Sequence, residues 1–106
     1  MRKGLKMEIF EVKRAIESEL IGAGFLKKRK YNGYEFSKPL NRYGYYAADV
    51  VACEASGVFA FSLLLIDAKN NEAEDEIAGV SFKFRGLSAD ELRAKISAIA
   101  EKIREA

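Results

Sequence analysis

The sequence contains no histidine, no tryptophan, one proline and one cysteine among its 106 residues. Without histidine the chain cannot form Ser-His-Asp or Cys-His catalytic arrangements, and it cannot form a metal site built on imidazole. The single cysteine, Cys53, can form neither an internal disulfide nor a zinc site made of thiolates. We therefore expect a protein that is not an enzyme and that needs no metal and no other cofactor.

Carboxylates are the remaining candidates for catalysis. Glu35, Asp49 and Glu54 fall in segments that read as strands, and five residues at 72–76 read EAEDE. Paired carboxylates can act as general acid and base, but neither group has a spacing typical of such a pair. The acidic run also lacks the alternating ligands and central glycine of a calcium loop. We interpret these residues as solvated surface carboxylates.

Long hydrophobic runs are absent as well. The longest, VFAFSLLLI at 58–66, has nine residues and is too short to cross a bilayer as a helix. The basic start MRKGLK is followed by charged residues such as Glu8 and Glu11 and not by the apolar region of a signal peptide. Cys53 lies in the strand-like segment VVACEA, which predicts a buried structural thiol. These features predict a cytoplasmic protein without a membrane segment.

The charge is distributed unevenly along the chain. Residues 1–46 contain 11 Lys and Arg against 5 Asp and Glu, which gives +6, whereas residues 47–106 contain 7 against 11, which gives −4. The sum is the small net charge of +2. A chain polarised in this way can present a basic surface although its total charge is close to neutral.

Hydrophobic periodicity predicts a helix over residues 7–21 and a second helix after Ser88, which forms a capping box with Glu91. Between them the pattern predicts a hairpin over 25–38, strands over 45–54, 58–66 and 77–84, and a long mobile acidic loop over 67–76. No helix separates neighbouring strands, which indicates an antiparallel meander. We therefore predict one α+β domain over residues 1–106. Its fold is a two-layer sandwich: an antiparallel meander sheet of four to five strands with the N- and C-terminal helices packed on one face.

The hairpin contains the main functional hint. Asn32-Gly33 is typical of a two-residue type I′ turn, and it would place Tyr31 opposite Tyr34 and Lys30 opposite Glu35. One face of the hairpin would then interleave aromatic rings with cations, a combination with which single-strand binders stack bases and neutralise phosphates. The candidate residues for binding single-stranded DNA or RNA are Lys27, Lys28, Arg29, Lys30, Tyr31, Tyr34, Arg42 and Tyr45.

Two other interpretations stay open. The lysines can simply protect an edge strand from pairing with other chains. Alternatively, the sheet face without helices can bind a protein partner or a second copy, as in an inhibitor, an immunity-type protein or a chaperone-like module, unless loops cover that face. The apolar residues expected on this face are Val51, Leu64, Ile66 and Ile77.

Overall fold

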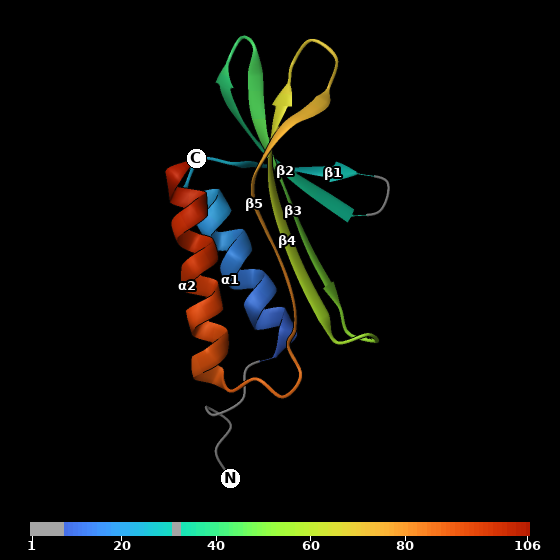
Figure 1. The fold of residues 1–106 in the computed structure, drawn as a ribbon, viewed down its shortest axis with the longest axis vertical. Helices are drawn as coiled ribbons and strands as arrows, with labels where there is room; N and C mark the ends of the chain where they lie inside the picture. Colours follow the sequence, from blue (N-terminus) through green and yellow to red (C-terminus); the bar gives the residue numbers. More distant parts are fainter. Residues whose placement is uncertain (1–7, 31–32) are drawn as a thin grey trace.

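The computed structural model describes residues 8–30 and 33–106, which form two helices and five strands. The strands form one antiparallel sheet in which each strand pairs with the next along the chain. Figure 1 shows the two helices packed together against one side of this sheet. The predicted α+β fold, a meander sheet between two terminal helices, is confirmed. The elements are α1 (Ile9–Gly22), β1 (Leu26–Lys30), β2 (Gly33–Asn41), β3 (Gly44–Cys53), β4 (Val58–Asp67), β5 (Glu72–Lys83) and α2 (Ala89–Glu105).

Each helix buries one apolar stripe against the sheet. At the start of α2, the Glu91 backbone N–H donates to Ser88 Oγ over 3.1 Å, and the Ser88 N–H donates to Glu91 Oε1 over 2.9 Å. This is the predicted capping box, which satisfies two N–H groups that the first helical turn leaves without partners. The buried stripes consist of Ile9, Val12, Ile16 and Leu20 on α1 and of Leu92, Ile99 and Ile103 on α2.

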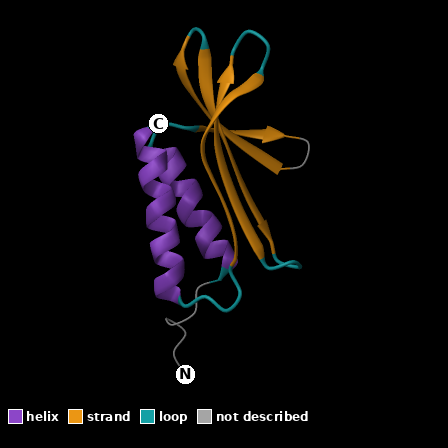
Figure 2. Ribbon diagram, viewed as in Figure 1, coloured by secondary structure: helices purple, strands orange, loops and turns teal. Residues whose placement is uncertain are grey.

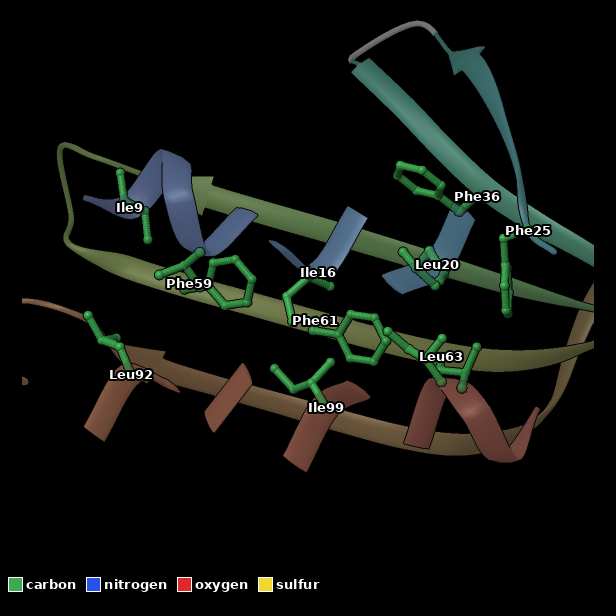
Figure 3. Packing of buried hydrophobic residues seen from close by; sticks show 13 residues of the cluster. Ile9, Ile16, Leu20, Phe25, Phe36, Phe59, Phe61, Leu63, Leu92 and Ile99 are labelled. Atoms are coloured by element: carbon green, nitrogen blue, oxygen red, sulfur yellow. The ribbon is translucent and has the colours of Figure 1, made fainter. Parts of the chain in front are cut away.

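The core lies between the helices and the sheet. Phe59, Phe61 and Leu63 alternate along β4 and point toward the helices, where each is at most 2% exposed. Figure 3 shows them between the residues of α1 and those of α2, with Phe25 and Phe36 close to Leu20 at one end of the cluster. The hairpin of β1 and β2 is therefore anchored in the same core as the rest of the sheet.

The acidic segment differs from the prediction. β4 continues to Asp67 and β5 already begins at Glu72, so the expected loop over 67–76 is wrong and the turn is confined to 68–71. The acidic residues join β5 because ladder bonds to the extended β4 satisfy their backbone groups, while their exposed side chains stay in water. Asn71 closes the turn with a φ of 57°, a conformation that asparagine tolerates better than most residues.

The register of the hairpin is also different. Lys30 pairs with Gly33, and Arg29 pairs with Tyr34, so the predicted pairing of Tyr31 with Tyr34 is wrong by two residues. Gly33 has a φ of 136°, which only glycine adopts readily, and this allows the pairing to continue up to it. Residues Tyr31 and Asn32 lie outside the described part of the chain. A shift of two residues leaves every side chain on its predicted face, because faces alternate with period two.

The hairpin turns away from the sheet beyond Phe36. β2 pairs with β3 from Asn41 to Phe36, whereas Gly33–Glu35 have no partner on β3. Figures 1 and 2 show the hairpin projecting from the side of the sheet. The last pair between β1 and β2 is Leu26 with Ser37, and Pro39 lies beyond it. Proline has no N–H, but at this position no bond to β1 requires one.

Candidate functional site

The projecting end of the β1–β2 hairpin carries four consecutive cations. All five residues of β1, from Leu26 to Lys30, are exposed. Lys27 and Arg29 share the face of Tyr34 and Phe36, on the side of the helices, while Lys28 and Lys30 share the opposite face with Glu35. The hairpin therefore presents positive charge on both of its faces.

Two of these cations have partners. Lys30 Nζ donates to Glu35 Oε2 over 2.7 Å, and this hydrogen bond raises the pKa of Lys30 above its ordinary value. Lys27 Nζ lies 4.3 Å from the centre of the Tyr34 ring and 4.0 Å from Glu17 Oε1, the limit of an ion pair. The remaining two cations, Lys28 and Arg29, form no ion pair with any residue that the structure describes. Their charges are available to an anion from outside.

The aromatic part of the predicted site is smaller than expected. Phe25 and Phe36 are 2% and 1% exposed and belong to the core. Tyr34, two residues from Phe36 on the same face, is 49% exposed. Tyr31 lies outside the described residues, so Tyr34 is the aromatic ring that the described part of the hairpin offers to a ligand.

Arg42 is not part of this cluster. It follows the last residue of β2 and lies eight residues beyond Tyr34, or about 26 Å away along an extended strand. Its guanidinium lies 5.0 Å from the centre of the Tyr43 ring. Tyr45, on β3, donates its hydroxyl to Asn71 Oδ1 over 3.2 Å, in the turn between β4 and β5. The structure thus brings together Lys27–Lys30 and Tyr34 and leaves Arg42 at the other end of β2.

The second predicted site, the apolar sheet face, does not form as one patch. Val51 is 54% exposed and Leu64 is half-buried, but Ile66 is only 8% exposed. Ile77 packs against the core on the helix side. For Ile77 the reason is a register shift between β4 and β5 at Leu63 and Leu64, since an extra residue in one strand changes which side chains face the core. The expectation that all four residues line the open face is therefore wrong.

Cys53 also differs from the prediction, because its thiol is exposed. It is the last residue of β3 and shares the face of Val51, which the helices do not cover. A hydrogen bond with the Ser56 side chain is the largest cause of a lowered pKa of the thiol. The predicted burial is wrong, because the same alternation that places Val51 on the open face also places Cys53 there.

A cleft between β2 and β3 is the feature that the sequence did not indicate. Where the hairpin leaves the sheet, it opens a cleft of ≈ 590 Å³ next to the end of β3. No local pattern marks this position, because the packing of Phe36 into the core decides where the two strands separate. The lining residues are Lys13 and Glu17 of α1, Lys30 of β1, Gly33 and Tyr34 of β2, and Asp49, Val50, Val51 and Ala52 of β3.

Within residues 8–30 and 33–106, no three residues among His, Cys, Asp and Glu are grouped closely enough to hold a metal ion. Neither described helix is long and apolar enough to cross a membrane. Comparisons of the chain with protein-family models, with curated proteins and with solved structures found no match.

Proposed function

We propose that this chain is a non-enzymatic, cytoplasmic binding module that holds single-stranded DNA or RNA on the projecting end of its β1–β2 hairpin. The observation that carries the proposal is the pair Lys28 and Arg29. Both are exposed, neither forms an ion pair with a described residue, and they stand on opposite faces of a ribbon that projects from the body of the protein.

The arrangement of Arg29 and Tyr34 suits a single strand. These two residues are direct cross-strand partners on one face, so a phosphate bound at Arg29 lies next to a ring on which an unpaired base can stack. Lys28 offers a second phosphate contact on the other face. A nucleic-acid strand bound along the end of the hairpin can thus contact a cation, a ring and a second cation within a few nucleotides.

The binding surface is held in place before a ligand arrives. Phe25 and Phe36 fix the base of the hairpin in the core, and the bond between Lys30 and Glu35 links the two strands near the tip. A surface that is ordered in the free protein loses less conformational entropy on binding.

Fluorescence anisotropy with labelled single-stranded DNA, single-stranded RNA and duplex DNA, measured over a series of salt concentrations, tests the proposal. We expect tighter binding of the single strands, with an affinity that falls log-linearly with salt by a slope of about −0.7 for each phosphate contact. The variant Lys28→Glu with Arg29→Glu should lose this binding. Its matched control is Arg93→Glu with Lys102→Glu, which changes the net charge equally at two exposed positions on α2.

If both double variants weaken binding equally, the interaction reflects net charge and not the hairpin. If the natural chain shows no binding even at low salt, the proposal is wrong, and the cations serve only to protect the β1 edge.

Tyr34→Ala separates stacking from charge. Stacking of one base on an aromatic ring contributes about 1–3 kcal/mol, so the affinity for single strands should fall about fivefold or more while the salt slope stays unchanged. An unchanged affinity would show that the ring does not contact a base.

A further inference from the structure

The hydrogen bonds at the two ends of the β3–β4 ladder show which backbone groups of β3 point toward β4. The Gly57 N–H donates to the Cys53 carbonyl over 2.9 Å, and the Ala68 N–H donates to the Tyr43 carbonyl over 3.0 Å. The register between β3 and β4 is continuous between these ends. In an antiparallel pair the bonding direction alternates from residue to residue, so the N–H and C=O groups of Val50 and Ala52 point the other way, toward β2.

β2 forms no ladder bonds with these groups. Its pairing with β3 stops at Phe36 and Ala48, and Gly33–Glu35 have no partner on β3. The backbone groups of Val50 and Ala52 therefore open into the cleft of ≈ 590 Å³ between the hairpin, β3 and α1, which both residues line. This segment is a short free edge inside a sheet whose outer edges are β1 and β5.

The three free edges of the described sheet differ in their protection. Natural proteins protect exposed edges with charges, prolines or bulges, because a free edge can pair with another chain. β1 carries four cations, while β5 carries four carboxylates and Lys83 and has register shifts with β4. The end of β3 reads DVVAC, without a proline, a bulge in its pairing with β4 or any charge after Asp49. The edge inside the cleft is thus the one whose own residues carry none of these protections.

We propose that this edge of β3 is a docking site for an extended segment of a partner protein, which adds a strand between the hairpin and β3. At about 3.3 Å per residue, residues 49–53 offer space for roughly four to five residues of an incoming strand. Backbone bonds to Val50 and Ala52 would supply affinity, and alternate side chains would supply specificity. This proposal does not rest on nucleic-acid binding, since it uses the backbone of β3 and neither Lys28 nor Arg29, although Tyr34 borders both sites.

A second copy of this chain is a poor occupant. The edge is recessed between α1, which supplies Lys13 and Glu17, and the hairpin, which supplies Gly33 and Tyr34. Two recessed edges cannot approach each other, and the projecting edges of a second copy, β1 and β5, carry charge. A slender extended segment is the shape that reaches the bottom of the cleft.

The lining indicates the side chains that the segment needs. On the sheet face without helices, the exposed Val51 favours a β-branched or other apolar residue beside it on the incoming strand. On the helix side Lys13 forms no ion pair with a described residue, while Glu17 already lies 4.0 Å from Lys27. A carboxylate on this side of the segment therefore complements Lys13. We expect an alternating sequence with apolar residues on one face and an acidic residue on the other.

To test this, nine-residue peptides that bind the protein are selected from a random phage-displayed library. NMR then measures the hydrogen exchange of the protein's backbone amides and so shows where each enriched peptide binds. In the free protein the amides of Val50 and Ala52 should exchange faster than those of Val51 and Cys53, which bond to β4. A bound synthetic peptide should slow the exchange of Val50 and Ala52 at least tenfold. Methylating the alternate backbone nitrogens of the peptide that face β3 should abolish binding, whereas methylating the intervening nitrogens should not.

Ala52→Pro tests the same bond from the protein side. It removes one N–H that points into the cleft and no N–H of the β3–β4 ladder, so the fold should be retained and the peptide affinity should fall at least tenfold. The matched control is Ser81→Pro on the outer edge of β5. The Phe84 N–H donates to the Gly57 carbonyl, and the register of β5 with β4 is continuous from there to Ser81. Because the bonding direction alternates from residue to residue, the Ser81 N–H, three residues before Phe84, points away from β4.

Three outcomes would overturn the proposal. The library can yield no enriched peptide, the enriched peptides can protect amides elsewhere and not those of Val50 and Ala52, or binding can be indifferent to the position of the N-methyl groups. The experiments with methylated peptides still test the proposal if the Ala52→Pro variant does not fold, because they use the unchanged protein.

Discussion

Tyr34 and Phe36 stand two residues apart on the same face of β2, yet Tyr34 is 49% exposed and Phe36 is 1% exposed. The two side chains have nearly the same ring and the same strand conformation. They differ in what covers them, because Phe36 packs into the cluster beneath the helices and Tyr34 lies where the hairpin has left the sheet. The boundary between the core and the candidate binding surface therefore runs through one strand.

The comparison shows how one short hairpin can serve both stability and binding. Its base contributes two phenylalanines to the core, and its end exposes four cations and one described tyrosine. A substitution at the base should change stability, and a substitution at the end should change binding.

The largest effect is expected for Phe36→Ala. Removing a fully buried phenylalanine costs about 3–5 kcal/mol, because apolar contacts are lost and a cavity remains. Urea unfolding followed by circular dichroism measures this loss. The same substitution at Tyr34 should cost less than about 1 kcal/mol, since half of its surface is already in water. Equal losses at the two positions would show that the hairpin end packs as tightly as its base.

A smaller effect is expected at the start of α2, in the helix layer that packs on the sheet. Ser88→Ala removes the side-chain acceptor for the Glu91 N–H at the start of α2 and should cost about 1 kcal/mol. Ser97, in the middle of the same helix and exposed, is the matched control. Ser97→Ala should be neutral or slightly stabilising, because alanine is the better helix former. Similar losses for the two variants would contradict a capping role of Ser88.

The capping box also predicts a pH dependence. Hydrogen bonds from the backbone and side chain of Ser88 lower the pKa of Glu91 below its ordinary value of 4.5. A carboxyl whose pKa is lower in the folded state stabilises the protein above its unfolded pKa, and this stabilisation is lost as the pH falls through the folded pKa. Glu91→Gln should therefore be less stable than the natural chain at pH 7, and this difference should shrink as the pH falls well below 4.5. A difference that stays constant over this range would show that the charge of Glu91 does not contribute.

The sequence predicted the elements better than their limits. The apolar stripes, the capping box and the alternation along β4 are local patterns, and the structure confirms them. The start of β5, the hairpin register and the side taken by Ile77 depend on pairing between strands, which local patterns do not determine.

The candidate site shows the same limit. The faces of Lys27 to Lys30 could be predicted because alternation survives a register shift of two residues. Which of the aromatic residues would be exposed could not be predicted, since this depends on how far the helices reach over the sheet. The free edge at Val50 and Ala52 exists only because β2 separates from β3 at Phe36, a consequence of tertiary packing that no motif marks.

The smallest effect on stability is expected at the hairpin end itself. Lys28→Glu with Arg29→Glu exchanges two exposed cations that form no ion pair with a described residue. Because the change at Lys28 places like charges opposite each other at Glu35, the free energy of unfolding should change by less than about 1 kcal/mol. The edge of β1 stays protected, because glutamates also discourage pairing with other chains. Urea unfolding and size-exclusion chromatography measure the two properties. A variant that remains folded and unassociated but no longer binds nucleic acid separates binding from edge protection, whereas a variant that aggregates shows that the cations themselves protect the edge.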